Sequence, residues 1–239
     1  MAKKIFGSAA AIGMLCMACS SPKPVAVKKD PGLYIQPHSV AVTMKDGWFT
    51  AKTLALGEYT TSSRTNGVAA NTPPKQWRSV SDAFYFSVKT AAEQFPVQVL
   101  STPRITFSNR PLPTSLSALA GDTPLWYITL GAVSSAPLKS WELILKRNLS
   151  FVELNENKQV GILRSATDEL RVTAHNRYGT RNSYEKTCYE FQLRGMPVAA
   201  VIPGETPQAW VHEKADAALR QTLAGAMLAL VFNEKLGAR

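Results

Sequence analysis

Residues 140–175 read SWELILKRNLSFVELNENKQVGILRSATDELRVTAH and carry the clearest structural pattern in the chain. In residues 140–154 apolar and polar side chains alternate, which is typical of a strand with one buried face. The apolar positions are Trp141, Leu143, Leu145, Leu149 and Phe151, and the polar ones are Glu142, Lys146, Asn148 and Ser150. Residues 155–159 then predict a turn, after which residues 160–175 run back along the first strand.

The alternation continues toward the C-terminus. Residues 176–183, NRYGTRNS, predict a second turn, and residues 184–195 run back with Tyr189, Phe191 and Leu193 on one face. Residues 196–204, MPVAAVIPG, add one more short strand. We therefore expect an antiparallel meander in this half of the chain.

The N-terminal half also indicates β-structure. Residues 39–45 and 48–61 predict a hairpin with Asp46 and Gly47 as its turn, because an Asp-Gly pair between alternating runs is a strong hairpin signal. Further strands are expected in residues 82–92, 95–102 and 125–135. Between them lie a polar loop and an irregular stretch with four prolines, residues 62–79 and 103–124.

The C-terminal residues follow a different pattern, which predicts a helix over about 207–235. Thr206 can cap it, Pro207 suits the first helical position, and Gly237 can end it. Beyond Ala224 the sequence is apolar on every side, so that half is expected to be buried. The fold class is therefore mainly antiparallel β, as a meander, sandwich or curved sheet, with one C-terminal α-helix packed on it.

The first residues indicate export. Lys3 and Lys4 precede an uncharged run, residues 5–18, which is shorter than the roughly 20 residues of a membrane-spanning helix. Small residues follow, and then a polar stretch with prolines. This order is expected of a cleaved signal peptide.

The end of that run, LCMACSS at residues 15–21, resembles the signal of bacterial lipoproteins in Leu15, Cys16, Met17, Ala18 and Cys19. The resemblance implies a signal peptide over 1–18, a lipid-bearing Cys19 as the first mature residue and acyl chains that hold the protein in a membrane. It leaves a flexible tether over 19–32 and a single β-rich domain over 33–239. Ser20 resembles the outer-membrane-sorted members, which face the periplasm. An ordinary signal cut near Ala18, which leaves Cys19 as a free thiol, is the alternative, and a retained N-terminus is a third.

The charge of the chain favours an anionic partner. The full sequence has a net charge of +10, and removal of Lys3 and Lys4 with the signal leaves 25 basic and 17 acidic residues, or +8. Such a protein is attracted to phospholipid, lipopolysaccharide, acidic glycans or nucleic acid. The export signal, and the lack of any nucleic-acid-binding motif in the sequence, argue against nucleic acid.

Two segments combine basic and aromatic residues in a way that suits such a partner, because Arg binds phosphate or carboxylate and aromatic rings stack on sugars or lie at membrane interfaces. The first is residues 175–186 and the second is residues 73–79. Their candidate contact residues are Arg177, Tyr178, Arg181, Tyr184 and Lys186, and Lys75, Trp77 and Arg78. An ordinary solvated turn, and a loop packed on the core through Trp77, are the alternatives.

The sequence contains no signature of catalysis. His38, His175 and His212 have no metal-ligand spacing, Cys188 is a lone thiol in the body, and no phosphate-binding or dinucleotide-binding motif occurs. No catalytic residue, metal or cofactor is predicted. We expect a non-enzymatic binding or assembly factor that contacts an envelope protein, an anionic lipid or a glycan. A carrier of a hydrophobic ligand, with Trp126, Trp141, Phe84 and Phe86 lining a β cavity, and an envelope hydrolase are the alternatives.

Overall fold

The structure is a computed structural model that describes residues 32–47, 50–70, 82–102, 111–112, 114–117, 125–131, 140–180, 182–233 and 236. The signal region with Cys19, residues 19–31 of the tether, the second candidate segment and Arg181 lie outside these ranges. Within them, no helix combines the length and the apolarity that crossing a bilayer requires.

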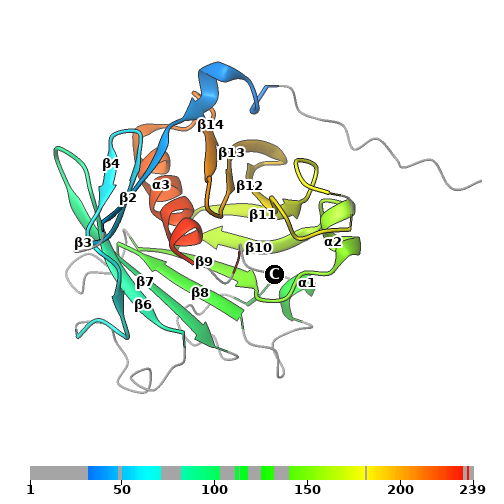
Figure 1. The fold of residues 1–239 in the computed structure, drawn as a ribbon. Coiled ribbons are helices and arrows are strands. Elements are labelled where there is room, and N and C mark those ends of the chain that lie inside the picture. The colour runs from blue at the N-terminus through cyan, green and yellow to red at the C-terminus, as the bar shows by residue number, and fades with distance from the viewer. Residues whose placement is uncertain are drawn as a thin grey trace, which may run out of the picture.

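One antiparallel sheet contains the strands of the described ranges and confirms the predicted fold class (Figure 1). The strands are β1 (Ser39–Val40), β2 (Val42–Gly47), β3 (Thr50–Leu56), β4 (Tyr59–Thr61), β5 (Thr65–Asn66), β6 (Phe84–Lys89), β7 (Gln94–Thr102), β8 (Leu125–Leu130), β9 (Trp141–Lys146), β10 (Gln159–Arg164), β11 (Glu169–His175), β12 (Cys188–Leu193), β13 (Met196–Ile202) and β14 (Gln208–Val211). The helices are the 3-10 turn η1 (Gln36–His38), α1 (Thr114–Ser117), α2 (Phe151–Asn155) and α3 (Ala217–Phe232).

The sheet curves into a nearly closed barrel. Its strand order is β1-β14-β13-β12-β11-β10-β9-β8-β7-β6-β4-β3-β2, with β5 paired to β6. The two end strands, β1 and β2, are consecutive in the sequence and separated by Ala41 alone. One bent segment therefore pairs with β14 through its first half and with β3 through its second half. The backbone NH of Gly57 donates to the carbonyl of Ala41 at 3.0 Å, which ties the bend to the β3–β4 turn.

Helix α3 occupies the inside of the curved sheet, where Figure 1 shows it surrounded by strands. It contacts β3, β4, β7, β8 and β13, and every residue from Thr222 to Phe232 is buried. Gly225 permits a close approach, because a Cβ there would lie 2.8 Å from Cε2 of Phe95. The four residues suggested as cavity walls, Trp126, Trp141, Phe84 and Phe86, belong to or pack against the same apolar cluster as α3.

Among the described residues, the opposite, outer face of the sheet is covered in two places. Alternation along β9 and β10 directs Ile144 and Ile162 away from α3, and both pack with Leu116 of α1 in a second apolar cluster. A third cluster forms where Leu33 of the N-terminal segment lies on Cys188, Ala200 and Ile202 of β12 and β13. This third cluster positions the candidate site.

The predicted helix over 207–235 is wrong at its start. Residues Gln208–Val211 form β14, which pairs with β13 on one side and with β1 on the other. The helix begins at Ala217, where the carboxylate of Asp216 accepts from the backbone NH of Leu219 at 2.8 Å. Asp216 is a better cap than Thr206 because it lies next to the apolar run. The residues that follow Thr206 are held in β14 by hydrogen bonds to β1 and β13.

The predicted strand over 140–154 is also too long. It ends at Lys146, and Ser150 then caps α2, which begins at Phe151. The Ser150 hydroxyl accepts from the backbone NH of Glu153 at 3.3 Å, and the Glu153 carboxylate accepts from the backbone NH of Ser150 at 2.8 Å. This reciprocal capping box starts a helix where the alternation of Leu149 and Phe151 had suggested a strand.

Two turns differ from the prediction. The hairpin of β2 and β3 is present, but Asp46 and Gly47 belong to β2, and Gly47 pairs with Thr50. Residues 160–175 form two strands rather than one, because Ser165 and Asp168 close a turn with a backbone hydrogen bond of 2.9 Å.

Candidate functional site

The N-terminal segment, residues 32–38, crosses the outer face of the sheet over β12, β13 and β14. In Figure 1 it runs across the top of the molecule next to β14. Leu33 is fully buried against the sheet, and Tyr34 packs beside Trp210. The segment is therefore anchored by apolar contact before any polar interaction is considered.

Beneath Tyr34 lies a buried carboxylate, Glu190 of β12, with 3% of its surface exposed. One oxygen accepts from the Tyr34 hydroxyl, and the other accepts from Nδ2 of Asn157 at 3.0 Å and Nε2 of Gln192 at 3.3 Å. Burial alone would raise its pKa, but hydrogen bonds from His175, Tyr34 and Asn157 outweigh burial and lower the pKa of Glu190 to about 2. Glu190 is thus a buried anion that its partners keep ionised.

His175 of β11 completes this cluster. Its Nε2 lies 3.3 Å from a Glu190 oxygen and 3.1 Å from the Tyr34 hydroxyl, and its Nδ1 accepts from the backbone NH of Arg177 at 3.4 Å. Because Nδ1 is an acceptor, the proton of the neutral ring is assigned to Nε2. Burial lowers the pKa of His175 despite the neighbouring carboxylate, so the ring is neutral at pH 7.

Cys188, opposite His175 in the β11–β12 pairing, is fully buried. Its sulfur lies 3.8 Å from the Tyr34 hydroxyl. Burial raises the pKa of this thiol, so it is protonated at neutral pH and lacks the thiolate character that a nucleophile needs. In the described ranges, the His175 ring has Tyr34, Glu190 and the backbone of Arg177 within hydrogen-bonding distance, and no serine.

An aromatic patch, which we define as Tyr34, Tyr178 and Trp210, lies above this cluster. The ring centroids are 5.5 Å apart for Tyr34 and Tyr178, 5.2 Å for Tyr34 and Trp210, and 5.9 Å for Tyr178 and Trp210. Tyr178 is 37% exposed, and burial raises its pKa to about 12, so its hydroxyl is neutral. The patch presents aromatic rings to solvent on a rigid support.

Arg177 adds a cation beside the patch. Its side chain is half-buried, and its Nε is buried without a hydrogen-bond partner among the described residues. The positive charge of Arg177 partly opposes the rise in the pKa of the Tyr178 hydroxyl, which places this charge close to that ring. A buried guanidinium nitrogen without a partner is costly. The half-buried guanidinium group as a whole suits an anionic oxygen at the surface.

The predicted contact residues therefore separate into two groups. Arg177 and Tyr178 lie at the aromatic patch. By contrast, the Tyr184 hydroxyl donates to the carbonyl of Leu149 at 2.8 Å, and its ring packs against Phe151. Lys186 is exposed in the turn before β12, and its φ of +51° is a left-handed conformation. Sequence reasoning missed Tyr34 and Trp210, because nothing local marks either residue as a neighbour of Tyr178.

Two of the histidines lie together in the structure, although their sequence spacing gave no sign of it. The rings of His38 and His212 lie against each other, tilted by 31°, with centroids 4.3 Å apart, although 174 positions separate them in the sequence. The described side chains nonetheless include no group of three or more His, Cys, Asp or Glu residues placed to hold a metal ion.

A buried ion pair between Arg164 and Glu142 stabilises the other covered part of the outer face. Nε of Arg164 donates to Glu142 at 2.6 Å, and the Tyr127 hydroxyl donates to the other Glu142 oxygen at 2.6 Å. A further guanidinium nitrogen of Arg164 donates to the carbonyl of Pro111 at 2.9 Å. This pair attaches the residues before α1 to the sheet and is a structural feature of the fold.

The chain matches no protein-family model, no curated protein and no solved structure. Its own fold and site define the class: a nearly closed antiparallel β-sheet around a C-terminal helix, with an N-terminal segment fastened over a buried carboxylate. The function is therefore argued from the site itself.

Proposed function

We propose that this protein is a lipid-anchored component of the bacterial cell envelope that acts as a non-enzymatic binding factor and docks on anionic lipid headgroups. The observation that carries the proposal is the aromatic patch with Arg177 beside it, at the point where the chain enters the domain. Tyrosine and tryptophan suit the boundary between headgroups and acyl chains, and an arginine suits a phosphate.

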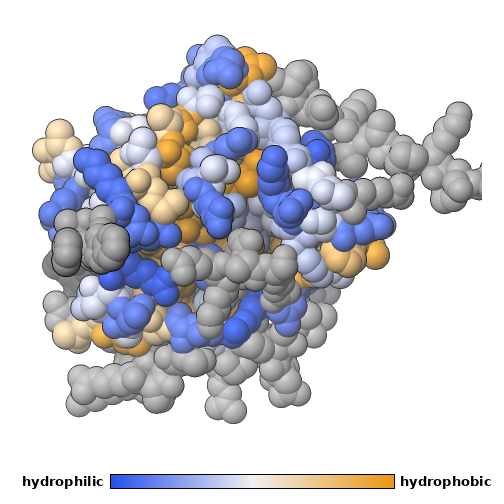
Figure 2. Space-filling model, in the orientation of Figure 1, coloured by the Kyte–Doolittle hydropathy of each residue, from blue (hydrophilic) through white to orange (hydrophobic). Residues whose placement is uncertain are grey.

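The position of the N-terminal segment supports a membrane rather than a distant partner. The expected tether of residues 19–32 reaches at most about 50 Å when fully extended, so an anchor at Cys19 keeps the patch near the bilayer. Ile35 follows Tyr34 and is 44% exposed, and Figure 2 shows apolar surface over this segment at the top of the molecule. An exposed apolar residue next to the patch favours insertion at the headgroup level.

The anchor is tested by the mass of the mature protein. We expect the protein made in a bacterial host to have the mass of residues 19–239 plus acyl groups, and the Cys19→Ala variant to lose those groups. Intact-mass spectrometry of the membrane fraction checks this. An unlipidated chain that begins at Cys19 would make the protein a secreted factor, and an uncleaved chain would contradict export.

Docking is tested with the unlipidated mature chain, residues 19–239 with Cys19→Ser, so that the anchor does not dominate binding. We expect co-sedimentation with phosphatidylcholine vesicles that contain phosphatidylglycerol, and none with phosphatidylcholine alone. Arg177→Gln is expected to weaken binding about fivefold, because one basic residue near an anionic surface contributes about 1 kcal/mol. Tyr178→Ala should weaken it further.

The matched control is Arg194→Gln. Arg194 is exposed in the β12–β13 turn, at the other end of the strands from the patch. We expect it to change vesicle binding less than twofold. Equal effects of the two arginine variants would show that net charge alone attracts the protein, and no binding to either vesicle would refute lipid docking.

A further inference from the structure

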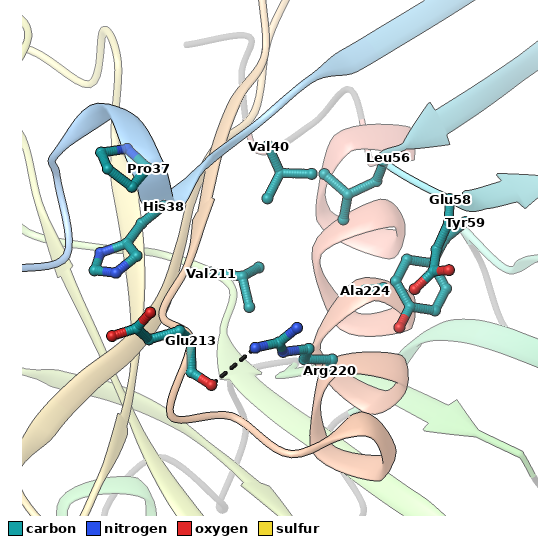
Figure 3. Close-up of a pocket in the computed structure, with 11 residues that line it drawn as sticks. Pro37, His38, Val40, Leu56, Glu58, Tyr59, Val211, Glu213, Arg220 and Ala224 are labelled. Carbon is teal, nitrogen blue, oxygen red and sulfur yellow. Dashed lines mark hydrogen bonds between the residues drawn. The ribbon is translucent and has the colours of Figure 1, made fainter.

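A cavity of about 380 Å³ opens at the rim of the barrel, beside η1 and β1 (Figure 3). The β3–β4 turn, the residues after β14 and the first turns of α3 form its other walls. This volume lies in the range of sites that hold small molecules. The cavity is separate from the aromatic patch, which none of its lining residues belongs to.

The inner wall of the cavity is apolar. Val40, Leu56, Val211 and Ala224 contribute it from four different elements, and Leu56 and Ala224 are buried members of the main core. Because these side chains are held by the sheet and by α3, the surface exists before any ligand arrives. It suits a short branched hydrocarbon group.

Arg220 of α3 supplies a fixed positive charge. Its Nε donates to the carbonyl of Ala215 at 2.7 Å, and another guanidinium nitrogen donates to the carbonyl of Glu213 at 2.8 Å, which is the dashed contact in Figure 3. Neutral carbonyls orient the guanidinium without cancelling its charge. Within the described ranges, no carboxylate lies within 4.0 Å of it, so an anionic ligand group would be its first ionic partner.

Two carboxylates share the polar side of the cavity. Figure 3 shows Arg220 between Glu213 on one side and Glu58 on the other, and both glutamates are exposed. The neighbouring Tyr59 hydroxyl is neutral, because burial and the Glu58 carboxylate raise its pKa. A purely anionic ligand would be repelled by the two carboxylates, and a purely cationic ligand would be repelled by Arg220.

We propose that this cavity binds a small zwitterion, an α-amino acid with a branched apolar side chain. The carboxylate of the ligand contacts Arg220, its ammonium group faces Glu58, and its side chain packs on the apolar wall. This ligand satisfies both signs of charge and the hydrocarbon surface at once, which no singly charged molecule does.

The first experiment is calorimetric titration of the unlipidated mature chain with L-leucine. Two analogues remove one charge each: 4-methylpentanoate lacks the amine, and 3-methylbutylamine lacks the carboxylate. We expect leucine to bind and each analogue to bind at least tenfold more weakly, with glycine also weaker because it lacks the side chain. Absence of leucine binding at several millimolar, or an analogue that binds as well as leucine, overturns the proposal.

Two variants test which residue of the cavity binds each charged group of leucine. Arg220→Gln should remove the preference for leucine over 3-methylbutylamine, and Glu58→Gln should remove the preference for leucine over 4-methylpentanoate. Glu58 lies in the β3–β4 turn, so its variant keeps the test valid if Arg220→Gln disturbs the start of α3. Lys214→Gln, exposed and outside the cavity lining, is the matched control and should bind leucine unchanged. Leucine binding that survives both cavity variants contradicts the assignment.

Discussion

Replacement of Phe232 by alanine is expected to lower the free energy of unfolding by about 3–5 kcal/mol, the usual effect of removing a fully buried phenylalanine. Phe232 ends α3 and has no exposed surface. Its ring centroid lies 4.8 Å from that of Phe86 on β6. Because the curved sheet surrounds α3, the space left by the ring has little freedom to collapse. Urea denaturation at pH 7 measures the change.

The matched control is Phe151→Ala, which removes the same side chain from an exposed position. Phe151 is 38% exposed at the start of α2, where Figure 2 shows apolar surface at the edge of the molecule. Its ring contacts Tyr184, so we expect a loss of about 1 kcal/mol. Equal losses for the two variants would mean that α3 does not support the barrel from inside.

Acidification is expected to remove about 3 kcal/mol of stability through Glu190 alone. Its pKa falls from the usual 4.5 to about 2 in the folded protein, and each tenfold change in proton affinity corresponds to about 1.4 kcal/mol. Because the folded-state pKa is lowered, this stabilisation is complete above pH 4.5 and disappears as the pH falls toward 2. Burial also lowers the pKa of His175 below its usual 6.5, so acid destabilises the fold through this residue too.

Glu190→Gln separates this effect from general acid unfolding. The amide keeps the size of the side chain but does not titrate, so we expect lower stability at pH 7 and a pH dependence about 3 kcal/mol smaller than that of the wild type. Chemical denaturation at a series of pH values gives both quantities. The control is Glu205→Gln in the exposed turn after β13, which should retain the wild-type pH dependence. Parallel curves for wild type and Glu190→Gln would contradict the buried network.

Acid should also release the N-terminal segment before the rest of the domain unfolds. Tyr34 is held by Glu190 and His175, and both groups change charge as the pH falls. Hydrogen exchange at the amides of residues 33–35 checks this order, because a segment that opens locally exchanges before the core of the sheet. Simultaneous exchange of this segment and of β11 would show that the contacts of Tyr34 with Glu190 and His175 do not hold the segment separately from the rest of the domain.

Local patterns identified most of the strands, and the two errors at helix starts arose where the sequence offered two conflicting local signals. The alternation through Leu149 and Phe151 fits a strand, but Ser150 and Glu153 form a capping box, and these residues adopt a helix. Thr206 with Pro207 and Asp216 both resemble helix starts. The four residues of β14 became a strand because β1 and β13 provide partners on both sides, which is information outside their own sequence.

Only some residues of the candidate site could be predicted from the sequence. Arg177 and Tyr178 were identified because turn composition is a local property. Tyr34 and Trp210 were not, since Tyr34 lies 141 positions from His175 in the sequence and still shares a hydrogen bond with it. The same limit applies to the rim cavity, whose walls come from residues as far apart as Val40 and Ala224.

The sequence by itself determined that the chain is β-rich and that the second half of its last helix is buried. Periodicity of two and an uninterrupted apolar run are local properties that bury the same faces in any packing. Only the tertiary structure decided that the sheet closes through the bend at Ala41, that α3 lies inside it, and that Glu190 is buried under Tyr34. Those features depend on strand register and on contacts between residues that are distant in the sequence. Such contacts form, and contribute to stability, only when the whole chain has folded.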